Sequence, residues 1–154
     1  MDLSDILAPG AVMPTVRSTS KKHVFQEIAT RMGEIYDLPS RRIFEGLNAR
    51  ERLGSTAMGY GVAIPHARIE GLDRIAGLFA RLETPIELDA ADGKGVDLLM
   101  VLLAPDDAGA DHLRALAKVS RLLREEAFRV KLRQTTTANA LHALLTDVSS
   151  SRAA

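Results

Sequence analysis

The segment 98-LLMVLLA-104 decides how this chain can fold. It belongs to a nearly continuous apolar run, 96–104, that Pro105 ends. A strand with one face in water alternates apolar and polar residues, whereas a strand covered on both faces is apolar throughout. The run is also far too short to cross a bilayer. We therefore expect a buried strand with helices on each face of its sheet.

Amphipathic helices are predicted on both sides of this run. Apolar residues at helical spacing predict a helix over 21–36, with N-cap candidates at 18–20, and a second helix that starts at Pro39 as its first residue. After the run, we expect helices over 111–125, 126–133 and 138–147. In the first of these three, the residues expected to face the core are Leu113, Leu116, Ala117 and Leu123.

The order of these elements predicts the fold class. Small and apolar residues predict a further strand over 74–82. Helices come before, between and after the strands without strict βαβ alternation, so we expect an α/β (α+β mixed) domain with a central mixed β-sheet flanked by helices on both faces. It should cover residues 1–148 as a single domain, followed by a disordered tail over 149–154.

Composition excludes several classes of function. The 154 residues include no cysteine, which rules out disulfides and thiolate chemistry. Lys plus Arg and Asp plus Glu both number 20, so no global positive field favours nucleic acid. The N-terminus has two acids and no basic stretch, which argues against a secretory signal. We expect a cytoplasmic protein without direct membrane insertion. The four histidines lack metal-ligand spacing, and we expect no metal and no cofactor.

The segment 59-GYGVAIPHAR-68 places a histidine after a stiff stretch of backbone. Gly59 and Gly61 allow a tight turn and close approach, and Pro65 fixes its own φ and extends the residue before it. His66 is thus presented by backbone with little freedom, as a nucleophile requires. Imidazole is largely neutral near pH 7 and keeps a free lone pair. His66 is the best covalent candidate here, although its spacing alone also fits a surface residue.

Two neighbouring features strengthen that hypothesis. The stretch 48-NARERLGSTAMG-59 supplies arginines that can clamp phosphoryl oxygens, together with hydroxyl groups. His112 stands at the start of a predicted helix, where its cationic form is disfavoured and a neutral ring can donate a hydrogen bond to phosphate. Taken singly, Arg50 and Arg52 also fit a solvated helix end, and His112 fits a surface position.

The block 50-RERLGSTAMGYGVAIPHARIEG-71 resembles the phosphorylation-site signature of the IIA proteins of the phosphoenolpyruvate-dependent phosphotransferase system. The resemblance is to the fructose/mannitol class and is closest to its nitrogen-regulatory branch. It continues through 82-LETPIELDAADGKGVDLLMVLLAP-105 and 111-DHLRALAKVSRLLRE-125, and it includes 3-LSDILAPGAV-12 and 20-SKKHVFQEIA-29. It therefore spans nearly the whole chain and also implies a mixed sheet flanked by helices.

The resemblance implies a phosphocarrier and a role for each matched residue. His66 matches the histidine that carries the phosphoryl group on Nε2, Arg50 an arginine beside it, and His112 a second histidine that supports the phosphate. The loop that shapes the phosphate pocket corresponds to Ser55, Thr56, Gly59 and Gly61. An HPr-type phosphocarrier protein is the implied donor. We expect it to dock on an apolar rim formed by Met58, Tyr60 and Ala63.

The sequence departs from the family at two positions and leaves three functions open. Tyr60 replaces an asparagine, and Ala67 replaces a glycine. The first function is a carrier whose phosphorylation state regulates nitrogen- or potassium-related partners, such as sensor kinases or potassium transport components. The second is a sugar-specific IIA that passes phosphate to a fructose or mannitol IIB. The third is a protein-binding module that is never phosphorylated, which the two departures favour.

Overall fold

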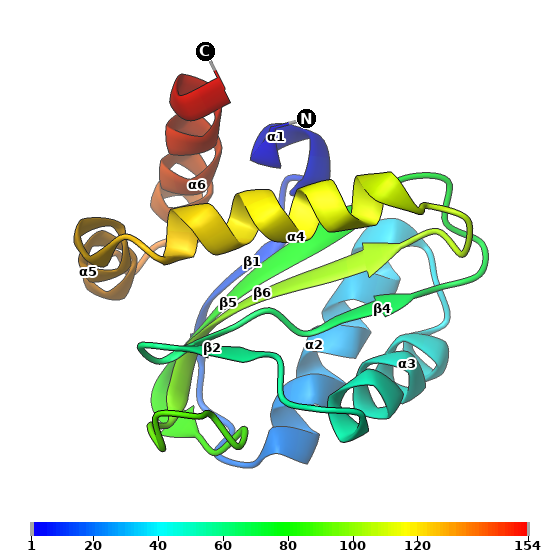
Figure 1. Cartoon of the computed structure of the whole chain (residues 1–154), viewed down its shortest axis with the longest axis horizontal. Coiled ribbons are helices and arrows are strands. Elements are labelled where there is room, and N and C mark those ends of the chain that lie inside the picture. Colours follow the sequence, from blue (N-terminus) through cyan, green and yellow to red (C-terminus); the bar gives the residue numbers. More distant parts are fainter. Residues whose placement is uncertain (1, 154) are drawn as a thin grey trace.

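A mixed sheet forms the centre of the structure (Figure 1). The computed structural model describes residues 2–153, and the side chains of residues 2–147. The strand order is β1-β5-β6-β3-β2, and β4 also pairs with β6. The strands are β1 (Val12–Val16), β2 (Ala57–Gly59), β3 (Val62–Ala63), β4 (His66–Arg68), β5 (Ala76–Ile86) and β6 (Val96–Ala104).

Strand β6 is the buried centre that the apolar run predicted. It is antiparallel to β5 and parallel to β3 and β4, while β1 is parallel to β5. All its residues except Asp97 are buried. Leu98, Met100 and Leu102 belong to the core cluster on one face of the sheet, whereas Leu99 and Val101 belong to the cluster on the other. The prediction of a strand covered on both faces is confirmed.

Helices cover each face of the sheet, as expected for the predicted fold class. On one face α2 (Lys21–Tyr36) and α3 (Ser40–Arg52) bury their apolar residues. On the other face lie α1 (Leu3–Ile6), α4 (Ala110–Leu123), α5 (Glu126–Gln134) and α6 (Ala138–Ala153). Figure 1 shows α4 running across the sheet, with α2 and α3 on the opposite side. The mixed sheet flanked by helices is therefore confirmed.

Several boundaries differ from those predicted. Strand β5 continues to Ile86, and Pro39 is the N-cap of α3 rather than its first residue. The analysis missed α1 and β1, both of which are short; β1 includes Pro14 and lies at the sheet edge, where proline is tolerated. The backbone of α6 is helical to Ala153, and residue 154 lies outside the described part. The disordered tail expected over 149–154 stays a prediction.

The inward face of α4 was predicted only in part: Leu123 is buried and Leu116 packs against the core, as expected. Leu113 is 69% exposed and Ala117 is also exposed, so neither faces the core. The buried residues of the helix are His112, Ala115, Val119, Leu122 and Leu123, which share one helical stripe. A histidine occupies the first position of this apolar stripe. This polar residue interrupts the apolar periodicity that the sequence shows, and it places an imidazole against the sheet.

Candidate phosphoryl-transfer site

His66 is the first residue of β4, on a short segment held against β6. His66 is paired with Leu102 of β6, whose N–H donates to the carbonyl of Pro65 at 3.0 Å. Two residues before His66, the N–H of Ile64 donates to the carbonyl of Thr56 at 3.1 Å. The half-buried imidazole is thus presented by backbone that is bonded on both sides. This supports the rigid presentation expected for a nucleophile.

The hydrogen bonds of His66 determine its tautomer. Nδ1 lies 2.8 Å from the carbonyl oxygen of Ile64, and a carbonyl can only accept, so Nδ1 carries the proton. Nε2 then holds the lone pair, and Nε of Arg50 donates to it at 3.3 Å. Nε2 is therefore the nitrogen that has a lone pair available for nucleophilic attack. It faces a guanidinium that can bind the oxygens of an incoming phosphoryl group.

His112 completes the site from the opposite side. Its ring centroid lies 5.3 Å from that of His66, with the two rings edge to face. The residue is 6% exposed, and its Nε2 is the one buried side-chain polar atom without a hydrogen-bond partner among the described side chains. Buried polar atoms in native proteins nearly always have a partner. The unpartnered nitrogen next to His66 is therefore a candidate point for binding a ligand.

Both histidines are kept neutral. Burial lowers the pKa of His66, the Ile64 carbonyl partly opposes that effect, and the charge of Arg50 lowers the pKa further. Burial also lowers the pKa of His112, and repulsion from His66 when it is protonated and from Arg68 adds to that effect. The first imidazole therefore keeps its lone pair as a nucleophile. The second can act as a neutral hydrogen-bond donor.

Arg50, not Arg52, reaches His66. Both lie in the last turn of α3, but Arg52 is exposed. Besides its contact with His66, Arg50 donates from Nη1 to the carbonyl of Gly54 at 2.8 Å. That bond orients the guanidinium over the imidazole. The structure therefore separates two arginines that the sequence alone left equivalent.

A buried carboxylate shapes the loop after α3. Glu51 is 7% exposed, and it accepts hydrogen bonds from the Thr56 amide at 2.9 Å and from the Thr56 hydroxyl at 2.6 Å. The hydroxyl of Ser55 donates to the carbonyl of Leu88 at 2.5 Å. The two hydroxyls thus fix the loop through protein contacts. Sequence reasoning missed Glu51, because an acid at a helix end usually faces water.

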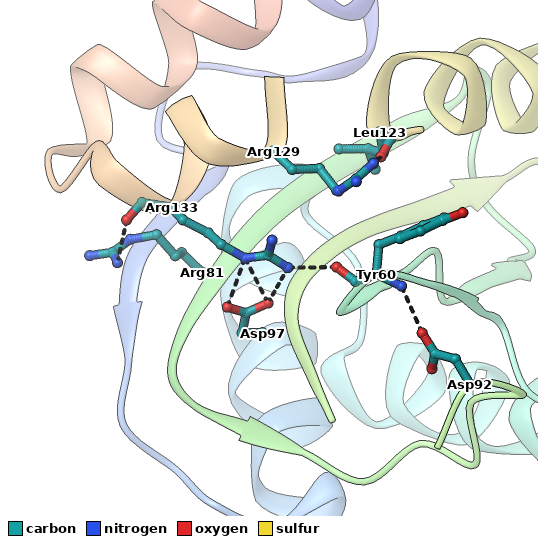
Figure 2. Close-up of polar contacts among 7 residues, drawn as sticks. All are labelled: Tyr60, Arg81, Asp92, Asp97, Leu123, Arg129 and Arg133. Carbon is teal, nitrogen blue, oxygen red and sulfur yellow. Dashed lines mark hydrogen bonds and ion pairs between the residues drawn. The ribbon is translucent and has the colours of Figure 1, made fainter. Parts of the chain in front are cut away.

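The turn between β2 and β3 places the two conspicuous glycines. Gly59, Tyr60 and Gly61 have φ values of 92°, 60° and 77°. Positive φ at both central residues is the mark of a type I′ hairpin, which favours Asn-Gly. Figure 2 shows how the turn is held: the Tyr60 amide donates to Asp92 at 3.0 Å, and Arg133 donates to the Tyr60 carbonyl at 2.7 Å. These glycines therefore serve a turn that contacts Asp92 and α5.

The apolar rim differs from the one expected. Ala63 is fully buried, so its side chain cannot contact a partner, and Met58 is half-buried against the core. Tyr60 is 56% exposed and remains a docking candidate. The sequence analysis missed Leu53, which is 85% exposed just after Arg50, and it wrongly placed Leu113, the neighbour of His112, in the core. Both leucines adjoin the residues that contact His66.

Two further observations concern membrane-spanning helices and metal sites. Within the described residues, none of the helices combines the length and apolar character needed to cross a membrane. No group of three acidic or histidine side chains is placed to hold a metal ion in that same part of the chain.

Comparisons with known proteins identify the family. Residues 5–148 match the family described as phosphoenolpyruvate-dependent sugar phosphotransferase system, EIIA 2. A nitrogen regulatory protein of Bradyrhizobium diazoefficiens is 48% identical over 145 residues, which are 94% of this chain and 95% of that protein. A nitrogen regulatory protein of Escherichia coli is 36% identical over 96% of this chain and 91% of its own length.

Solved structures agree. The crystal structure of nitrogen regulatory protein IIA-Ntr from Neisseria meningitidis has a TM-score of 0.88 at 36% identity, covering 94% of this chain and 99% of that one. The IIA mannitol structure from Escherichia coli, at 16% identity and a TM-score of 0.74, shares the fold. The chain therefore belongs to the EIIA 2 family of the phosphoenolpyruvate-dependent phosphotransferase system.

Proposed function

We propose that the protein is a phosphocarrier that accepts a phosphoryl group on Nε2 of His66 from an HPr-type phosphohistidine protein. The observation that carries this proposal is the 2.8 Å bond from Nδ1 to the Ile64 carbonyl, which leaves the lone pair on Nε2. Arg50 stands at 3.3 Å from that nitrogen, and the buried Nε2 of His112 lacks a partner. A phosphoryl group on His66 would give His112 a partner and would place its oxygens beside Arg50.

The transfer step follows from this arrangement. The Nε2 lone pair attacks phosphorus in line, the phosphorus–nitrogen bond of the donor breaks, and the donor imidazole keeps that electron pair. Positive charge developing on His66 is stabilised by the Ile64 carbonyl, which accepts from Nδ1–H. Arg50 stabilises the phosphoryl oxygens, and His112 donates to one of them. Phosphoryl transfer needs positioning and charge stabilisation more than covalent help, which fits these roles.

The donor is proposed to dock on an apolar rim. Leu53 and Leu113 are 85% and 69% exposed and adjoin the residues that contact His66 from opposite sides. Exposed apolar side chains that flank one site can contribute to a protein-contact surface. Replacing either leucine with serine should raise the KM for the donor and leave kcat unchanged. A fall in kcat alone would contradict docking.

Phosphorylation is proposed to regulate the carrier's partners. A phosphoryl group adds about 1.5–2 negative charges at one site, which can change the binding of another protein. The relatives at 36–48% identity are named nitrogen regulatory proteins, and this supports a regulatory role with nitrogen-related partners. Potassium-related partners are the other class that we propose.

Transfer to a sugar-specific IIB is the alternative. The chain is 29% identical to an Escherichia coli EIIABC component specific for 2-O-alpha-mannosyl-D-glycerate. Loading purified fructose or mannitol IIB from the phosphorylated protein would favour this role.

The test is a phosphorylation assay with phosphoenolpyruvate, enzyme I and an HPr-type carrier, read by intact mass and by acid lability. We expect one acid-labile phosphoryl group that His66→Ala abolishes and His112→Ala slows. If the wild-type protein gains none, the carrier mechanism is wrong. Appearance of an adduct only in Tyr60→Asn, Ala67→Gly would instead favour the binding module.

A further inference from the structure

The two histidines lie on different elements, so something must fix their separation. His66 follows the β2–β3 turn on a segment paired with β6, whereas His112 lies in the first turn of α4. Their ring centroids are 5.3 Å apart. A misplacement of about 1 Å in such a site can slow a reaction roughly a hundredfold. The position of α4 relative to the His66 segment is therefore important for transfer.

Apolar packing holds α4 on the sheet but does not fix it along its own axis. Ala115, Val119 and Leu122 pack into the core cluster of that face. Hydrophobic burial is not directional, so a small slide of the helix changes it little. Hydrogen bonds depend steeply on distance and angle. The polar contacts of α4 are the ones that can set its axial position.

Arg129 makes such contacts at the C-terminal end of α4. The residue is 7% exposed, and its Nη1 donates to the carbonyl of Leu123 at 3.1 Å and to that of Arg124 at 2.7 Å. These carbonyls end the helix and carry the negative end of its dipole. The guanidinium carbon also lies 4.4 Å from the centroid of the Tyr60 ring. One side chain thus joins α4 to the β2–β3 turn.

The turn itself is fixed to the strand that supports His66. Arg133 donates to the Tyr60 carbonyl and forms an ion pair with Asp97 of β6 at 2.9 Å, as Figure 2 shows. The carbonyl of Gly61 accepts from the amides of Asp97 and Leu98 at 3.0 and 3.1 Å. The turn therefore moves with β6. A contact between α4 and this turn therefore also links α4 to β6, the strand that pairs with the His66 segment.

We propose that Arg129 is a positioning residue for phosphoryl transfer: by holding both Tyr60 and the last carbonyls of α4, it sets where His112 stands relative to His66. A cleft of about 340 Å³ opens beside this contact and is lined by Tyr60, Lys94 and Val130, among others. Close packing therefore does not hold the guanidinium on that side. The inference rests on the proposed carrier function and adds a residue to it.

The experiment compares Arg129→Met with Arg121→Met, which makes the same chemical change at an exposed position of α4. With an HPr-type donor, Arg129→Met should lower kcat about tenfold and leave KM within about twofold, because positioning is lost while docking is kept. In the unphosphorylated protein, the nuclear Overhauser effect between the rings of His66 and His112 should weaken. Arg121→Met should match the wild-type protein in both measurements.

Opposite results would overturn the proposal. A folded Arg129→Met with wild-type kcat and an unchanged ring-to-ring signal, or a change confined to KM, would show that Arg129 only stabilises the fold. If Arg129→Met fails to fold, Tyr60→Leu takes its place; it removes the ring from an exposed position and should lower kcat about threefold. If the wild-type protein is never phosphorylated, the carrier function fails, and the ring-to-ring signal alone decides the role of Arg129.

Discussion

The segment from Tyr60 to His66 has an arginine beside an aromatic ring at each of its ends, and the two ends differ in how fully their polar groups are bonded. At the Tyr60 end, the amide, the carbonyl and the ring each have a partner, in Asp92, Arg133 and Arg129. At the His66 end, Arg50 bonds to the nucleophilic nitrogen, and the buried Nε2 of His112 has no partner.

This difference distinguishes the residues that hold the turn in place from those proposed to take part in phosphoryl transfer. Leaving a buried polar group unpaired destabilises a protein by about 1–3 kcal/mol, so such a group persists where a ligand is to meet it. A turn that is fully bonded has no need of a ligand and acts as a frame. Changes at the His66 end should therefore alter transfer and spare the fold, while changes at the Tyr60 end should act first on stability or positioning.

Apart from changes to His66 itself, the largest effect is expected from Arg50→Met. The change removes the charge that faces the phosphoryl oxygens, and loss of one such group typically lowers kcat about a hundredfold or more. Its matched control is Arg52→Met, two residues on in the same helical turn and exposed. Rapid-quench measurement of phosphoryl transfer would show the difference. Equal rates for the two variants would mean that the contact between Arg50 and His66 has no part in transfer.

Gly61→Ala should destabilise the β2–β3 turn, at the Tyr60 end of the segment. A Cβ at this position would overlap Nη2 of Arg133 and come within 2.9 Å of Asp97 Oδ1, at a φ of 77°. Left-handed backbone costs about 1–2 kcal/mol for a residue other than glycine, and the overlap adds about 1–3 kcal/mol. Gly93→Ala is the control, because its φ is 73° and it has open space around it.

The two glycine variants should differ in unfolding free energy measured with urea. Gly93→Ala should lose about 1–2 kcal/mol, and Gly61→Ala about 2–5 kcal/mol. Equal losses would show that the Arg133–Asp97 pair yields freely, and that the turn is less firmly held than its bonds indicate.

Sequence reasoning reached the elements whose pattern is long and strong. The run Val96–Ala104 and the helix Lys21–Tyr36 were predicted with their observed bounds, because unbroken apolar residues and helical spacing are clear signals. The strand Val12–Val16 has neither signal, since Pro14 and Thr15 interrupt it. His66 could be singled out because Pro65 and two glycines frame it.

The partners of the site were harder to predict, because tertiary contacts decide them. Nothing local to Glu51 or Arg129 indicates that a charged side chain is buried there. Arg129 is buried because α5 lies against the end of α4 and the β2–β3 turn, which are distant from each other in sequence. The exposure of Leu113 follows likewise from the choice of His112 for the inward face. The local periodicity of the sequence does not reveal such contacts.

His112 should contribute one hydrogen bond to the transfer step. His112→Ala removes the donor and should slow transfer about tenfold or more, because bonds to charged groups contribute about 1.5–3 kcal/mol. His112→Gln restores a neutral N–H donor at that position and should recover part of the rate. If the glutamine variant were slower than the alanine variant, a role as hydrogen-bond donor would be contradicted.

The rate of transfer should resist mild acid. The pKa of His66 is lowered by burial, and a neutral imidazole is required for attack. The rate should therefore fall to half of its plateau value only at a pH below about 6.5, the ordinary histidine pKa. A rate that halves near pH 6.5 would show that His66 is solvated in the working protein.

Stability should respond to the same shifts. The folded protein keeps His66 and His112 neutral where the unfolded chain binds protons, so the unfolding free energy should fall as pH drops below about 6.5. The fall should end once the pH passes the lower folded pKa values. His112→Gln cannot take up a proton and should show a shallower fall. An equal pH dependence in both proteins would contradict the lowered pKa of His112.

The smallest change is expected from Tyr60→Asn. Asparagine adopts a φ of 60° more readily than tyrosine, while the loss of the ring removes the contact with Arg129, which contributes about 0.5–1 kcal/mol at an exposed site. The bond from Arg133 goes to the main-chain carbonyl and survives. The two effects oppose each other, so the unfolding free energy measured with urea should change by less than about 1 kcal/mol.

Tyr60→Phe, the control, keeps the ring and should match the wild-type protein. A loss above about 2 kcal/mol would show that the ring anchors the fold. If Tyr60→Asn lowers kcat but leaves the unfolding free energy nearly unchanged, the Tyr60 ring serves positioning rather than folding. Gly61→Ala, by contrast, is expected to lower the unfolding free energy.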